Sequence, residues 1–111
     1  FIIKGIQEKK GKNVAVLNMG NIEHAVCQNF IICHGDSNTQ VEAIADSVRY
    51  QVKSNLKLQP DHVEGMQNSQ WVLLDFGNIL VHVFQKQYRD YYKLEELWAD
   101  ANIELIEEKT F

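Results

Sequence analysis

The segment from Trp71 to Phe84 constrains the fold of this chain more than any other. Gly77 and Asn78 lie between two runs rich in Val, Ile, Leu and aromatic residues, which is the short-range signature of a two-residue β-hairpin. Because side chains alternate along a strand, this register divides the hairpin residues between two faces. One face is wholly apolar and consists of Val72, Leu74, Phe76, Ile79, Val81 and Val83. We expect this face to pack on the core.

The opposite face of the predicted hairpin mixes apolar and polar residues. Its cross-strand pairs are Trp71 with Phe84, Leu73 with His82, and Asp75 with Leu80. This face is too apolar for an ordinary solvated surface and too polar for a sealed core, so it predicts contact with a partner. Two alternatives stay open. Trp71 and Phe84 could form an aromatic pair beneath a helix of the same chain, and His82 could be a half-buried structural residue.

Hydrophobic periodicity predicts helices and strands before the hairpin. We expect a short helix, two strands, a long helix and a third strand over Phe1–Lys10, Asn13–Met19, Phe30–His34, Ser37 to about Leu56, and His62–Gln67. Ser37 and Gln40 have the spacing of a capping box, in which each side chain accepts a hydrogen bond from a backbone N–H group at the helix start.

After the hairpin the pattern changes to a helical period. Tyr91, Leu94 and Trp98 form a stripe that we expect to pack an aromatic-rich helix on the sheet. Residues 99–111 are acidic and predict a short helix, a strand or a mobile tail. The order of the elements predicts a mixed sheet packed with helices, in the α/β or α+β class.

The composition predicts one globular domain in a reducing compartment. A chain of 111 residues, of which 45% are hydrophobic, can bury a core of its own. No apolar run approaches the roughly 20 residues of a membrane span, and Phe1–Lys10 lacks the pattern of a signal peptide. Two cysteines, Cys27 and Cys33, are too few for a disulfide scaffold, so a cytoplasmic location fits best.

The net charge of −4 argues against a nucleic-acid-binding surface. Neutralising phosphates requires clustered Lys and Arg, whereas the eleven basic residues of this chain are dispersed among fifteen acidic ones. A basic protein partner is easier to reconcile with this charge.

The residues indicate no metal site, no cofactor and no catalytic group. Four histidines occur in four separate segments, at His24, His34, His62 and His82. They share no metal-ligand spacing with one another or with the cysteines. Gly35–Ser37 could cradle a phosphate at a helix start, but no lysine completes a phosphate-binding loop. The hydroxyl of Ser37 is expected to cap the helix and not to act as a nucleophile.

Three blocks of residues, in this order, resemble one protein family. They are Gly35-x-Ser37-x-x-Gln40-Val41-x-Ala43-Ile44-Ala45-Asp46, then Trp71-Val72-Leu73-Leu74-Asp75-Phe76-Gly77-Asn78 continuing to Val81-His82-Val83-Phe84, then Arg89-x-Tyr91-Tyr92-x-Leu94-Glu95-x-Leu97-Trp98. Together they are similar to the ribosomal silencing factor family, also called Iojap-like or RsfS. The resemblance covers residues 1–98 as one domain and leaves 99–111 as an acidic C-terminal tail. It implies a mixed five-stranded sheet flanked by helices, nucleotidyltransferase-like but without the catalytic carboxylates.

The resemblance also implies a function that is not enzymatic. Members bind a large-subunit ribosomal protein of the L-fourteen family at the face where the small subunit would dock, so the two subunits cannot join. The chain is then expected to be a translational repressor that damps translation under nutrient limitation. Some members are linked to assembly of the large subunit instead, and the sequence does not separate the two roles.

The partner-binding site is expected on the hairpin block and the helix that follows it. Tyr and Arg carry much of the binding energy at interfaces, which adds two residues of that helix to the hairpin residues. The candidates are Trp71, Leu73, Asp75, Gly77, Asn78, Leu80, His82, Phe84, Arg89 and Tyr92. The same face could pair with a second copy of the chain when the ribosome is absent.

The chain departs from the family's pattern at two places. Gln28-Asn29-Phe30 stands where the family has Asp-Tyr-Phe, and Gly77-Asn78 stands where it has Gly-Asp. The second change removes a charge that could help to bind a basic partner, although Asn suits the turn equally well. The alternative from another class is a nucleotide-binding or nucleotidyl-transferring enzyme that uses Gly35–Ser37.

Overall fold

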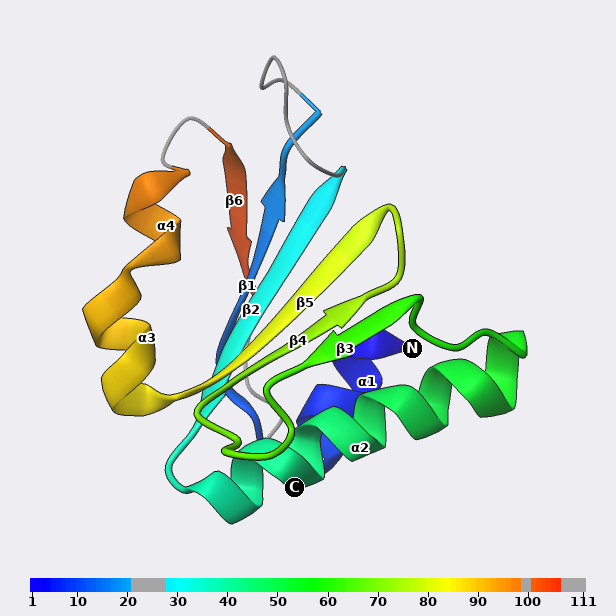
Figure 1. Ribbon diagram of the computed structural model, residues 1–111. Coiled ribbons are helices and arrows are strands. Elements are labelled where there is room, and N and C mark those ends of the chain that lie inside the picture. The colour runs from blue at the N-terminus through cyan, green and yellow to red at the C-terminus, as the bar shows by residue number, and fades with distance from the viewer. Residues whose placement is uncertain (21–27, 99–100, 107–111) are drawn as a thin grey trace.

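A six-stranded mixed β-sheet lies between two layers of helices (Figure 1). The computed structural model describes residues 1–20, 28–98 and 101–106. The strands are β1 (Lys12–Asn18), β2 (Asn29–Gly35), β3 (His62–Glu64), β4 (Trp71–Asp75), β5 (Ile79–Gln85) and β6 (Asn102–Leu105). The helices are α1 (Ile2–Glu8), α2 (Asn38–Leu56), α3 (Lys86–Tyr92) and α4 (Leu94–Leu97). None of these described helices is both long enough and apolar enough to cross a bilayer.

The hairpin has the predicted register and sits inside the mixed sheet. The strand order is β3-β4-β5-β2-β1-β6, with β2 and β5 parallel and the other neighbours antiparallel. The predicted pairs of Trp71 with Phe84, Leu73 with His82, and Asp75 with Leu80 lie directly opposite each other. Gly77 takes a φ of +86° in the turn, which a residue without a side chain adopts at little cost.

The sheet has six strands, so the expectation of five is wrong. The sixth strand, β6, lies in the acidic segment after Trp98 and pairs antiparallel with β1. A strand was one of three alternatives for that segment, because four mostly exposed residues are too few for a periodicity to identify. The free backbone edge of β1 supplies the hydrogen-bond partners that turn this segment into a strand.

One hydrophobic core lies between the sheet and the layer of α1 and α2. The apolar stripe on α2 is buried as predicted, at Val41, Ile44, Ala45, Val48 and Val52. The apolar hairpin face packs in the same core, with Val72, Leu74, Val81 and Val83 fully buried. The two helices approach closely at Gly5 of α1. A Cβ atom added there would lie only 2.8 Å from the Val48 Cα atom of α2.

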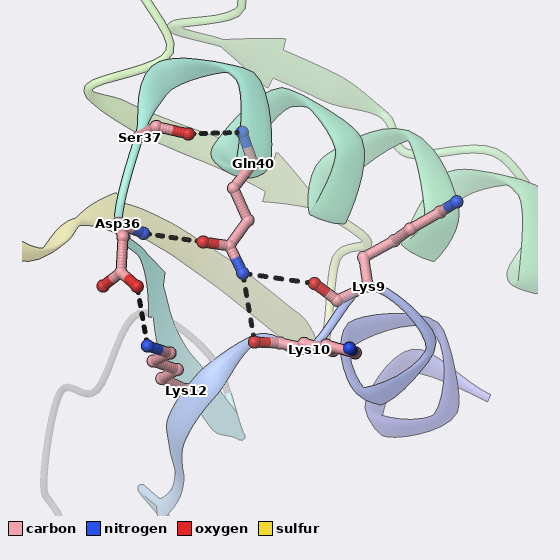
Figure 2. Close-up of polar contacts among 6 residues, drawn as sticks. All are labelled: Lys9, Lys10, Lys12, Asp36, Ser37 and Gln40. Atoms are coloured by element: carbon pink, nitrogen blue, oxygen red, sulfur yellow. Dashed lines mark hydrogen bonds and ion pairs between the residues drawn. The ribbon is translucent and has the colours of Figure 1, made fainter. Parts of the chain in front are cut away.

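Gln40 joins the start of α2 to the end of α1 (Figure 2). Its backbone N–H donates to the Oγ atom of Ser37 over 3.1 Å, as a capping box requires. Its Oε1 atom accepts from the backbone N–H of Asp36 over 2.8 Å, one residue before the cap residue that a capping box would use. Its Nε2 group donates to the carbonyl oxygens of Lys9 and Lys10 over 3.3 and 3.2 Å. One amide therefore connects three segments.

The aromatic segment after the hairpin forms two short helices where one was predicted. α3 ends at Tyr92, the next residue Lys93 has a left-handed φ of +50°, and α4 begins at Leu94. This break redirects the chain, so a spacing of three and four residues no longer keeps one side of the segment on the sheet. Leu94 is buried and Trp98 is half-buried, but Tyr91 is 78% exposed. The predicted packing stripe is therefore wrong at Tyr91.

Replacing Gln40 with Met keeps a similar side-chain length and removes the amide. We expect the free energy of unfolding to fall by about 1–3 kcal/mol, because the Asp36 N–H and two carbonyl groups lose their partner. Urea denaturation followed by circular dichroism measures the change. Thr39→Ala, at an exposed position on the same turn, is the control and should change stability by less than about 0.5 kcal/mol. Equal stability of both variants would refute the role given to Gln40.

Candidate functional site

The mixed face predicted for the hairpin lies on the side of the sheet that α3 and α4 partly cover. We call the following side chains of β3, β4 and β5 the hairpin face: His62, Glu64, Trp71, Leu73, Asp75, Leu80, His82 and Phe84. Strand alternation places them opposite the residues that pack under α1 and α2. The hairpin face has a covered end at Phe84 and an open end next to the turn between β4 and β5.

At the covered end, aromatic rings build a second core beneath α3 and α4. The Trp71 ring stacks on Phe84 with 4.9 Å between centroids, and Tyr92 of α3 lies 4.7 Å from the Trp71 ring. Phe30 of β2 lies 4.8 Å from the ring of His82. Phe84 is fully buried, which favours the alternative of an aromatic pair covered by the chain's own helix. Trp71 is only half-buried and Tyr92 is 45% exposed, so both still reach the surface.

His82 is buried within the hairpin face and carries no charge. It is 5% exposed, and its Nδ1 atom accepts a hydrogen bond from the Trp71 Nε1–H over 3.0 Å. Burial lowers the pKa of His82 to about 4. Since Nδ1 accepts, the proton of the neutral ring is on Nε2, which has no hydrogen-bond partner among the described residues. His82 therefore orients the Trp71 indole from below and offers no charge to a partner.

The Arg89 side chain is used inside the protein. Its guanidinium donates to the Glu95 carboxylate, to the carbonyl oxygen of Lys12 over 3.3 Å and to the Nδ1 atom of His34 over 3.0 Å. Only 10% of the side chain is exposed. Burial, assisted by the positive charge of Arg89, lowers the pKa of His34, which therefore accepts as a neutral ring. Arg89 holds α3 and α4 to each other and to β1 and β2, and it has no free donor fork to offer a partner.

The open end of the hairpin face is accessible and of mixed polarity. Leu73, Asp75 and Leu80 are partly exposed, and Gly77 and Asn78 are exposed in the turn. One carboxylate oxygen of Asp75 accepts from the Gly77 N–H over 2.8 Å, which fixes the turn. Five of the ten predicted site residues thus gather at this end.

Two residues that the sequence analysis did not select extend this surface. His62 and Glu64 of β3 lie opposite Asp75 and Leu73 of β4. Their side chains are 58% and 64% exposed, and the His62 Nε2 atom lies 2.7 Å from the Glu64 Oε1 atom. The signal that could have found them is the alternation around Val63, which packs on the core and so turns its two neighbours to the other face.

Acidic residues outnumber basic ones in the half of the chain that includes β3, β4 and β5. From residue 58 onward the sequence has ten Asp or Glu and four Lys or Arg, whereas residues 1–57 have five and seven. At the open end, Glu64 and Asp75 border the apolar side chains of Leu73 and Leu80. An apolar centre with carboxylates at its edge suits a basic protein surface.

The turn at Gly35–Ser37 is occupied by structural contacts. The Ser37 hydroxyl caps α2, as predicted, and Asp36 forms an ion pair of 2.6 Å with Lys12. Across the described part of the chain, no three His, Cys, Asp or Glu side chains gather as possible metal ligands.

The depressed pKa of His82 predicts that the fold weakens in mild acid. The folded pKa of about 4 lies below the ordinary 6.5, so the native state binds fewer protons than the unfolded chain between these pH values. The free energy of unfolding should therefore fall by about 2 kcal/mol between pH 7 and pH 5 through His82 alone. Urea denaturation at both pH values measures it.

His82→Asn is the matched control for this effect. The Asn side-chain oxygen can still accept from the Trp71 N–H, but the amide does not titrate. His34, whose pKa is also lowered, remains in both proteins, so the difference between them isolates His82. An equally steep loss of stability in His82→Asn would contradict the assignment.

Comparisons with known proteins agree with this architecture. A family model described as "Ribosomal silencing factor during starvation" matches residues 1–110. The chain is similar to the "Ribosomal silencing factor RsfS" of Bacillus subtilis, with 43% identity over 94 residues, which are 85% of this chain and 78% of the relative. It is also similar to the mouse "Mitochondrial assembly of ribosomal large subunit protein 1", with 26% identity over 104 residues, covering 89% of this chain and 44% of the mouse protein.

A solved structure extends the likeness to the fold. The crystal structure of a protein from Chromobacterium violaceum superimposes with a TM-score of 0.83 and 36% identity, covering 88% of this chain and 80% of that one. The family match spans the helices, the sheet and the segment that forms β6. The chain therefore belongs to the family of ribosomal silencing factors.

Proposed function

We propose that this protein represses translation by binding the large ribosomal subunit and keeping the small subunit from joining it. The observation that carries this proposal is the match to the silencing-factor family over residues 1–110. The contact on the large subunit is a ribosomal protein of the L-fourteen family, as the resemblance in the sequence implies. Because the protein acts by occupying a surface, it needs no reactive group, and it damps translation when nutrients are limiting.

The open end of the hairpin face is the surface that we assign to this contact. Its apolar centre, at Leu73, Leu80 and the exposed edge of Trp71, can be buried by a partner, while Glu64 and Asp75 face basic side chains at the rim. Burial of such a centre supplies affinity, and the carboxylates speed the encounter with a positively charged surface.

Trp71 is the anchor that we expect to contribute most to affinity. Its indole is held by the hydrogen bond to His82, by stacking on Phe84 and by a tilted ring contact with Tyr92. A side chain that is already fixed in one orientation loses little conformational entropy on binding. In this proposal Phe84, His82 and Arg89 act from beneath the surface, and Trp71 and Tyr92 make the aromatic contacts.

Assembly of the large subunit is the second candidate function. The mouse relative, named for mitochondrial assembly of the large ribosomal subunit, favours it. The same docking surface would serve both roles, since both require binding to the large subunit. Off the ribosome, a second copy of the chain could occupy this surface instead.

Replacing Leu73 with Arg should weaken binding to isolated large subunits by about tenfold or more, because it puts a cation in the centre of a surface that faces a basic partner. Co-sedimentation with purified large and small subunits, scored separately, measures the effect. Leu105→Arg is the matched control, because Leu105 is 74% exposed on the opposite edge strand and on the same side of the sheet. A folded Leu73→Arg variant that binds like the control would remove the hairpin face from the interface.

Silencing and assembly make different predictions for subunit joining. A silencing factor added to separated mature subunits should lower the light scattering that reports their association, in proportion to the large subunits occupied. Leu73→Arg should have a much smaller effect at the same subsaturating concentration. Normal joining in the presence of saturating protein, together with large-subunit precursors accumulating in cells that lack it, would favour assembly over silencing.

A further inference from the structure

At the rim of the hairpin face, one histidine lies between two carboxylates. His62 and Glu64 are two residues apart on β3 and therefore point to the same side of the sheet. The His62 Nε2 atom lies 2.7 Å from the Glu64 Oε1 atom, and Asp75 of β4 is directly opposite His62. The imidazole thus pairs with Glu64 and lies beside the strand position of a second acid, Asp75.

The charged groups that act on His62 come from its own strand and from the strand beside it. The hydrogen bond and charge of Glu64, with a smaller contribution from Asp75, raise the pKa of His62 above its ordinary value. β3 is an edge strand with β4 as its neighbour in the sheet, and the pair is open to solvent, with 58% of the His62 side chain exposed. An imidazole at such an exposed edge can be replaced by another cation.

We propose that His62 is an internal competitor for a Lys or Arg side chain of the docking partner, so that binding at the hairpin face strengthens when His62 loses its proton. The inference rests on the proposed function, since it concerns the same surface. While it is protonated, His62 neutralises Glu64 and weakens the attraction of the rim for a basic side chain. The neutral imidazole no longer compensates the charge of Glu64, so a guanidinium or ammonium group of the partner can displace it and pair with Glu64, beside Asp75.

The direction of the pH effect follows from this competition. Deprotonation of His62 makes the rim one charge more negative, so affinity for a basic partner rises as the pH is raised through the titration of His62. Because these groups are exposed, the change should be about two- to fivefold at low ionic strength and smaller at high salt.

The test is the dissociation constant for purified large subunits at about pH 6 and about pH 8, for the full chain and three variants. The unmodified protein should bind about two- to fivefold more tightly at the higher pH. His62→Ala, without the competing charge, should bind tightly at both, and His62→Lys, with a permanent charge, should bind weakly at both. Glu64→Gln should bind more weakly than the unmodified protein at the higher pH.

Glu104→Gln is the control for the loss of a carboxylate, because Glu104 is exposed on β6, the strand at the opposite edge of the sheet from β3. It should leave both the affinity and its pH dependence unchanged. Binding by His62→Ala with the same pH dependence as the unmodified protein would overturn this inference and leave the proposed function standing. No binding of the unmodified protein to large subunits at either pH would overturn both.

Discussion

The two central strands, β2 and β5, are largely buried on both faces, and the need to cover both faces is the constraint on which the rest of the structure depends. On one face, α2 provides a long cover of 19 residues, which also makes the crossover that a parallel pair requires. On the other face, α3 and α4 have only seven and four residues and cover the aromatic end of the hairpin face, with Leu80 packed at the edge of the aromatic cluster. The open surface assigned to the partner is the part of the sheet that these short helices do not reach.

The short cover stays in place because of Arg89. The chain turns into the left-handed region at Lys93, so backbone hydrogen bonds alone do not keep α4 in line with α3. The guanidinium bridges this break through Glu95 and reaches the sheet through His34 and the carbonyl oxygen of Lys12. Charge-assisted hydrogen bonds are strong where they are largely buried. Here they fix α4 relative to α3, as the backbone hydrogen bonds of a continuous helix would. Arg89, which its residue type suggested as an interface residue, therefore has a structural role.

The candidate site could be predicted in outline but not residue by residue. The alternation along the hairpin predicts the correct pairs, and it therefore assigns Leu73, Asp75 and Leu80 to the correct face of the sheet. Alternation does not say how far a helix extends over that face. The extent of the helical cover is what buries Phe84 and leaves Leu73 accessible. Alternation around Val63 also does not say which strand β3 pairs with, so only the tertiary structure connects His62 and Glu64 to the site.

Local chemistry was enough for the sequence to determine the hairpin, the cap at Ser37 and the buried stripe of α2, because each depends on residues close together in the chain. Contacts between distant segments decided the rest. β6 exists because the edge of β1 is free, the Gln40 amide meets a carbonyl group 30 residues earlier at the end of α1, and Arg89 meets a strand 77 residues earlier in the chain. Periodicity carries no information about such partners, since only the packed sheet brings them within hydrogen-bonding distance.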